Sequence, residues 1–175
     1  PIWNLKKFTV TGNGDIVDKN GDKAIGLDGN IKSSACSIWT DDAICASTSA
    51  GGDGNDVGLG GASQVLRSAS SRKLYGNFGS GLTDFTKTNA ENKAGGETAL
   101  ANYIGVDKAQ LTKLFDWAKG VDVDDDDGDN NVTDKRKDIL GDPLHSKPLA
   151  INFGTKTSPD IRILMGTNHG FLHMF

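Results

Sequence analysis

The run IRILMGTNHGFLHMF, residues 161–175, decides the fold class of this sequence. Its first part is continuous and apolar, which is typical of a buried strand. The tetrapeptide TNHG at 167–170 has the composition of a tight turn and leads into further strand-like residues. A second strand-like run, LHSKPLAINF at 144–153, precedes it across the turn sequence GTKTSPD. Residues 136–175 therefore predict several consecutive strands.

The N-terminal part of the chain is less regular. Residues 2–10, IWNLKKFTV, roughly alternate apolar and polar side chains and predict a strand. From 26 to 61 the sequence is rich in Gly, Ser, Ala and Asp, which predicts long loops. The polar stretch at 79–96 is also expected to be a surface loop.

One helix is predicted clearly, over DKAQLTKLFDWAK at 107–119. Its apolar residues recur at the spacing of a single helix face. Asp107 and Gln110 have the spacing of a capping box, and Gly120 follows where a C-terminal glycine is common. A shorter helical turn, ETALANYIG, is expected just before it.

The composition favours turns over helices. The chain has 175 residues, with 21 Asp and only 2 Glu among its 23 acidic residues, and 23 Gly. Asp and Gly favour turns, caps and metal-binding loops, whereas Glu favours helix interiors. The sequence therefore predicts a mainly β protein with a few helices.

Charge and hydropathy exclude two classes of protein. A net charge of −4 disfavours a nucleic-acid-binding surface. No apolar run approaches the ~20 residues that a membrane-spanning helix needs. We therefore expect neither a nucleic-acid partner nor a span across the membrane.

An acidic loop at 122–134 is the strongest functional signal, because it holds seven Asp and no basic residue. Calcium loops place oxygen ligands at alternate positions, and a cation relieves the repulsion among crowded carboxylates. The spacing predicts a calcium site, with ligands Asp125, Asp127, Asp129, Asn131 and Asp134. Arg136 stands where a bidentate Glu is usual, so Asp134, Asp138 or a distant carboxylate has to complete the shell. An alternative register uses Asp122, Asp124 and Asp126, and the spacing does not choose between the two.

A weaker loop of the same kind lies at DKNGDKAI, residues 18–25. Asp18, Asn20 and Asp22 have the alternate spacing of calcium ligands, but Lys23 would place a positive charge beside the ion. The simpler interpretation of this loop is a hydrogen-bonded turn between strands.

Cys36 and Cys45 are the two cysteines of the chain. They either form a disulfide that closes a short loop or remain as two buried thiols. No Cys-x-x-Cys motif is present, so neither a redox motif nor a zinc ribbon is supported. If the two are bridged, the protein belongs to the periplasm or the extracellular space.

The sequence shows no catalytic set. His145, His169 and His173 lack an acid–base–nucleophile arrangement of recognisable spacing. The glycine-rich stretches have no Lys-Ser or Lys-Thr after them, so they do not predict a phosphate-binding loop. We therefore do not expect an enzyme.

Several segments resemble those of the PilC/PilY-type tip proteins of type IV pili, in the same order along the chain. The two longest are RKDILGDPLHSKP at 136–148 and GTNHGFLHMF at 166–175. Shorter ones are WNLKKF at 3–8, SIW at 37–39, GLGGASQVL at 58–66 and WAKGVD at 117–122. The chain departs from the family pattern at His169, where Asp is usual, and at Met174, where Ala is usual.

The resemblance implies that this chain is the start of a C-terminal β-propeller region, truncated after its opening strands. A propeller needs several blades of about 40 residues, so 175 residues form only part of one. The expected organisation is an entry strand with a loop and helix insertion at 1–121, the acidic loop at 122–135 and the opening blade strands at 136–175. The family has an Asp-rich calcium loop of its own, but the ligands assigned above depend on spacing and not on matched position.

The implied function is calcium-dependent pilus assembly and surface adhesion. Minor pilins are the implied partners, with a receptor on a host cell or an abiotic surface. The implied location is the bacterial cell surface, at the pilus tip, or the periplasm and outer membrane. Two alternatives are a structural calcium-binding protein of the surface or matrix and an extracellular enzyme built on a propeller.

Overall fold

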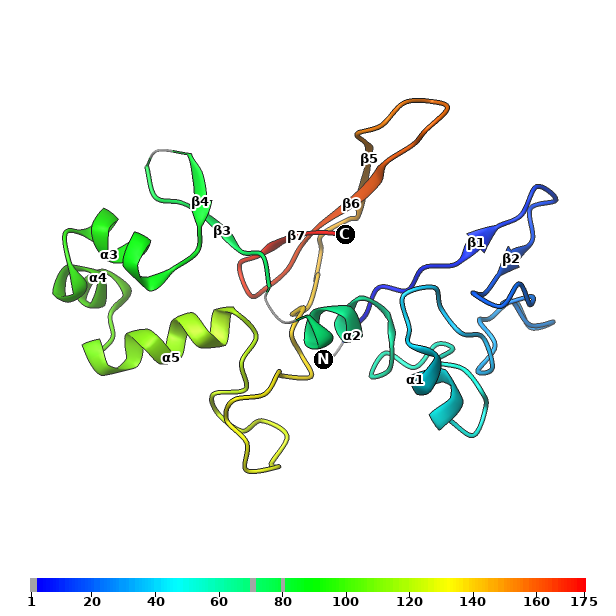
Figure 1. Cartoon of the computed structure of the whole chain (residues 1–175), viewed down its shortest axis with the longest axis horizontal. Coiled ribbons are helices and arrows are strands. Elements are labelled where there is room, and N and C mark those ends of the chain that lie inside the picture. The colour runs from blue at the N-terminus through cyan, green and yellow to red at the C-terminus, as the bar shows by residue number, and fades with distance from the viewer. Residues whose placement is uncertain (1–2, 70–71, 80) are drawn as a thin grey trace. The chain divides into compact units, whose positions relative to one another are not determined.

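The computed structural model describes residues 3–69, 72–79 and 81–175 (Figure 1). The chain forms two compact units, the first from residues 1–68 and 137–175 and the second from residues 69–136. These bounds differ from the three segments expected from the sequence, because residues 137–175 return to the N-terminal part of the chain.

The described residues form five helices and seven strands. The first unit contains β1 (Thr9–Val10), β2 (Ile16–Val17), α1 (Asp42–Ser47), α2 (Gly61–Ser68), β5 (Leu149–Asn152), β6 (Ile161–Gly166) and β7 (Leu172–Met174). The second contains β3 (Tyr75–Asn77), β4 (Leu82–Asp84), α3 (Lys87–Ala94), α4 (Glu97–Ile104) and α5 (Lys108–Ala118). The protein is thus a mixed α/β structure, and the prediction of a mainly β chain is wrong because helical residues outnumber strand residues.

The C-terminal run forms the largest sheet, with the antiparallel order β5-β6-β7. Its turn lies at the expected place, where Thr167 N–H donates to Phe171 O at 2.9 Å between β6 and β7. One face of the sheet is covered, so that the cross-strand pair Met165 and His173 is buried. Leu149 and Met174 are exposed, so β6 belongs to a sheet covered on one face and not on both.

The sheets of the described residues have two, two and three strands, and no propeller blade of four strands occurs among them. Near the N-terminus, the expected strand at 2–10 is limited to Thr9–Val10. The residues before it bond to a loop and to the first turn of α2 instead of to a strand. Leu5 O accepts from Ala62 N–H and Lys7 O accepts from Ile38 N–H, both at 2.9 Å.

The two long family-like segments lie against each other in the first unit. Asp142 N–H donates to Asn168 Oδ1, and Asn168 N–H donates to Asp142 O, both at 2.8 Å. Ile139 and Leu140 are fully buried in the core of this unit. Around them pack Ala62, Trp3, Leu5, Trp39, Leu66 and Phe175.

The second unit is built around the predicted helix, α5. The capping box of Asp107 and Gln110 is present, and Leu111 and Phe115 are buried. The helical turn expected at ETALANYIG is α4. The core contains Ala90, Leu100, Ala101, Leu111 and Phe115.

The expectation of a surface loop at 79–96 is wrong over β4 and over its second half, which forms α3. Thr86 accepts a hydrogen bond from Asn89 N–H at the start of this helix, and Gly95 ends it in the left-handed conformation. The helix buries only Ala90, and for this reason its sequence lacks an apolar pattern.

Candidate metal centre

The acidic loop emerges from a narrow neck just after α5, drawn in yellow in Figure 1. Val121 and Lys135 form an antiparallel bridge at this neck. On one side of the bridge Asp122 N–H donates to Asp134 O, and on the other Arg136 N–H donates to Gly120 O, both at 3.0 Å. The loop is therefore closed at its base by backbone hydrogen bonds.

Inside the loop the backbone curls in successive turns. Asp125 N–H donates to Asp122 O, and Gly128 N–H donates to Asp125 O, both at 3.2 Å. Asn130 has a positive φ of 65°, as the calcium-loop register requires of its sixth position. These turns direct alternate side chains toward a common point.

Asp125, Asp127 and Asp129 come together at this point. One carboxylate oxygen from each lies within 4.8 Å of the others. Oxygen ligands lie 2.3–2.6 Å from calcium, so two ligands on opposite sides of one ion are about 5 Å apart. The group is therefore able to hold a metal ion of this size.

Asp134 and Asp122 add two more carboxyl groups, which lie at the neck of the loop and outside this group of three. Partial burial, together with the charges of Asp129, Asp127 and Asp122, raises the pKa of Asp134 above its ordinary value. Asp122 is only 1% exposed. Its Oδ1 accepts from Asp126 N–H at 3.0 Å, whereas its Oδ2 has no hydrogen-bond partner.

The structure thus brings together the first three acids of the first register and divides the alternative set. Asp122 lies with Asp134 at the neck and not with the other two members of the alternative set. Asp124 pairs with Lys113, and Asp126 is exposed. Asn131 Oδ1 accepts from Thr133 N–H and Oγ1, which leaves the Asn131 backbone carbonyl as its available oxygen.

The second candidate loop, at 18–22, is a hydrogen-bonded turn. Asp18 is 4% exposed, and its carboxylate accepts from the N–H groups of Asn20, Asp22 and Cys36 at 2.9–3.1 Å. Both oxygens of Asp18 are thus occupied by backbone donors. Asn20 and Asp22 take part through their backbone N–H groups, which donate hydrogen bonds and cannot bind a cation.

Cys36 and Cys45 form a disulfide, which is consistent with an extracytoplasmic protein. Asp53 lies beside it, with Oδ1 3.9 Å from Cys45 Sγ. This is a contact and not a hydrogen bond, because a disulfide sulfur carries no hydrogen. The two sulfurs are bonded to each other and are not available to a metal.

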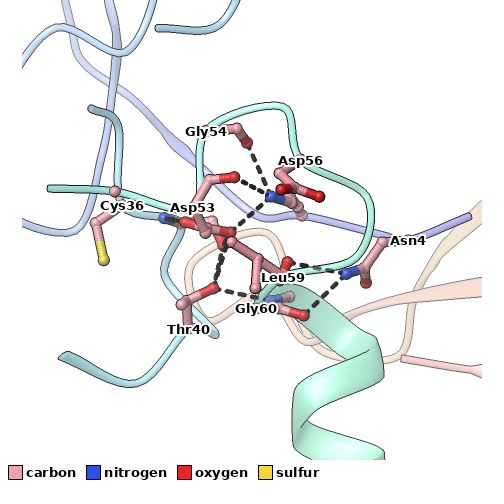
Figure 2. A network of polar contacts seen from close by, with 12 residues as sticks. Asn4, Cys36, Thr40, Asp53, Gly54, Asp56, Leu59 and Gly60 are labelled. Atoms are coloured by element: carbon pink, nitrogen blue, oxygen red, sulfur yellow. Dashed lines mark hydrogen bonds and ion pairs between the residues drawn. The ribbon is translucent and has the colours of Figure 1, made fainter. Parts of the chain in front are cut away.

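Asp53 is the centre of a buried polar network that the sequence analysis missed (Figure 2). Its side chain is fully buried and forms a 2.8 Å ion pair with Lys6. Ser37 donates to it through N–H and Oγ, at 2.7 and 3.0 Å, and Thr40 through Oγ1 at 3.0 Å. Burial opposes ionisation of Asp53, but these donors hold its pKa below the ordinary value.

The network also links remote parts of the first unit. Lys6 Nζ donates to the backbone oxygens of Asp53 and Gly54, at 2.6 and 2.9 Å. A Cβ at Gly60, where φ is 59°, would lie 2.1 Å from Thr40 Oγ1. The loop around Asp53 is therefore packed too tightly for any side chain at position 60. Both carboxylate oxygens of Asp53 already accept from donors of the protein.

The three histidines do not form a site. His173 is buried and its Nε2 lies 2.9 Å from Leu140 O, while His145 is exposed. His169 Nε2 lies 3.9 Å from Asp138 Oδ2. Among the described residues, no histidine belongs to a group whose ligand atoms could hold one ion.

In the part of the chain that the structure describes, no helix has the length and apolar character needed to cross a membrane. A comparison with protein-family models, curated proteins and solved structures finds no match for this chain.

Proposed function

We propose that the acidic loop binds one calcium ion. The observation that carries the proposal is the convergence of Asp125, Asp127 and Asp129, whose oxygens lie within 4.8 Å of one another. Hard carboxylate oxygens are the ligands that calcium prefers. Asp134 and the backbone carbonyl of Asn131 are the further ligands that we assign.

The crowding of charge favours this proposal over a solvated acidic surface. Carboxylates held this close repel one another. A divalent cation replaces the repulsion by attraction. Calcium suits the site better than magnesium, because it accepts irregular shells of six to eight oxygens in flexible loops.

Isothermal titration calorimetry of the whole chain with calcium tests the proposal. We expect one site in the wild type and none in Asp127→Ala. Asp124→Ala is the matched control, because it removes a neighbouring carboxylate that pairs with Lys113. Unchanged affinity in Asp127→Ala would contradict the ligand assignment.

We further propose that the chain is part of a PilC/PilY-type pilus-tip protein that acts in pilus assembly and surface adhesion in a calcium-dependent way, without enzymatic activity. Its support is the ordered series of family-like segments. The contact between 136–148 and 166–175 agrees with a common structural role for the two longest segments. In this proposal β5, β6 and β7 belong to an opening propeller blade.

A binding assay distinguishes this proposal from its alternatives. Immobilised chain is incubated with purified minor pilins, with calcium and with a chelator. Capture of pilins only in calcium supports the pilus-tip function. Calcium binding without pilin capture favours a structural surface or matrix protein, and turnover of a panel of glycosides and alcohols favours an enzyme.

A further inference from the structure

We infer that Asp122 is a ligand of the calcium ion, and that the ion closes the neck of the acidic loop by binding Asp122 and Asp134 together. The inference rests on the proposed calcium site and adds what that ion does to the structure. It adds Asp122, at the base of the loop, to the ligands assigned above.

The first argument is the position of the two side chains. The bridge between Val121 and Lys135 sets Asp122 directly opposite Asp134, and one N–H···O bond joins them. Side chains of opposed residues in an antiparallel pair lie on the same face, with Cβ atoms about 5 Å apart. Two like charges in this position destabilise the neck unless a cation lies between them.

The second argument is the burial of Asp122. At 1% exposure, a carboxylate needs partners for both oxygens, and Asp122 has one only for Oδ1. The donor to Oδ1 is Asp126 N–H, which belongs to the loop itself, so the carboxylate lies at the inner side of the loop. An ion bound to Oδ2 would supply the missing partner.

The third argument is Asp134 itself. Its Oδ1 is buried and has no hydrogen-bond partner, as is also true of Asp122 Oδ2. One ion between these two opposed carboxylates would supply a partner to both.

Closure of the neck has a consequence for the end of α5. The strand after Asp134 continues into Arg136, whose N–H donates to Gly120 O. The Arg136 guanidinium stacks on Trp117 of α5, 4.0 Å from the ring centre. Calcium that holds Asp122 against Asp134 therefore also holds this stack in place.

Asp122→Asn is the variant that tests the inference, because an amide oxygen still accepts from Asp126 N–H while the charge is removed. Asp126→Asn is the matched control, since its side chain is exposed. Calcium affinity is measured by calorimetry on the whole chain. Hydrogen exchange of the Asp122 and Arg136 amides is measured with and without calcium.

We expect Asp122→Asn to bind calcium at least about tenfold more weakly, since changes around a metal site commonly cost 10–100-fold. We expect the control to bind like the wild type. Calcium should slow exchange at both neck amides in the wild type and the control, and much less in Asp122→Asn. Without calcium, Asp122→Asn should melt at the same or a higher temperature than the wild type, because it loses a like-charge pair.

The outcomes separate the two proposals. Wild-type affinity in Asp122→Asn, or exchange at the neck amides that calcium leaves unchanged in the wild type, would overturn the inference and leave the calcium site standing. Absence of calcium binding by the wild type would overturn the calcium site, and the inference with it. Both proposals are supported if Asp122→Asn, and not the control, binds calcium more weakly and loses the calcium-dependent protection of the neck amides.

Discussion

Replacing Asp53 with alanine removes the centre of the polar network in the first unit. Its side chain is fully buried, and Lys6, which pairs with it at 2.8 Å, is only 11% exposed. The variant leaves Lys6 without its carboxylate partner. It also leaves Ser37 N–H and the hydroxyls of Ser37 and Thr40 without this acceptor.

The expected loss of stability is large. Breaking a buried ion pair by removal of one partner typically costs about 3–5 kcal/mol, because the other charge stays buried. Each buried donor that loses its acceptor adds a penalty, but these penalties overlap and do not sum. A domain is stable by about 5–15 kcal/mol, so Asp53→Ala should remove about a fifth of this or more.

Urea denaturation of the wild type and of Asp53→Ala, followed by circular dichroism, measures the effect. Asp56→Ala is the control in the same loop, because the Asp56 side chain is exposed and accepts from Gly58 N–H. We expect the control to lose less than about 1 kcal/mol. A loss of similar size in both variants would refute the reasoning that the buried ion pair organises this unit.

Three further predictions follow from the same structure. Because folding lowers the pKa of Asp53, its ionised side chain stabilises the fold at pH values above its ordinary pKa of 3.8. This stabilisation is lost as the pH falls through the folded-state pKa, so Asp53→Asn should lose less stability on acidification than the wild type. Reduction of the disulfide between Cys36 and Cys45 should destabilise the chain by about 2–3 kcal/mol, measured by urea denaturation with and without reductant. Phe115→Ala should cost about 3–5 kcal/mol, with the loss of hydrogen-exchange protection concentrated in α3, α4 and α5, because this ring is 6% exposed in their shared core.

Elements with complete local signals could be predicted from the sequence. Helix α5 has a capping box, an apolar face and a following glycine, and it forms where expected. The turn between β6 and β7 also matches its local sequence. Helix α3 could not be predicted from hydropathy because it buries only Ala90, although Thr86 and Gly95 mark its two ends.

The candidate site also has one part that the sequence predicts and one part that it does not. The alternate spacing of Asp125, Asp127 and Asp129 is local, and the structure brings these three side chains together. The pairing of Asp122 with Asp134 depends on the register of the neck, which spacing along the loop does not contain. For that reason the sequence could not indicate that Asp122 lies opposite Asp134.

The network around Asp53 could not be predicted from residues that are close in sequence. Lys6 and Asp53 are 47 residues apart, and a lysine in a strand-like segment carries no signal of burial. The glycine-rich stretch at 51–61 predicted a loop and is one up to Gly60, but five of its residues are buried. They are Asp53 and four glycines, Gly52, Gly54, Gly60 and Gly61, where an added side chain would collide with neighbouring atoms. Composition indicated the loop and could not indicate its packing.

Native mass spectrometry of the intact 18.5 kDa chain, before and after treatment with a chelator, tests the central claim most directly. We predict that the chain carries the mass of one calcium ion, that chelation removes it, and that a variant with Asn at 125, 127 and 129 never acquires it. A wild-type chain that stays free of calcium at saturating concentration, or a triple variant that binds calcium equally well, would contradict the account.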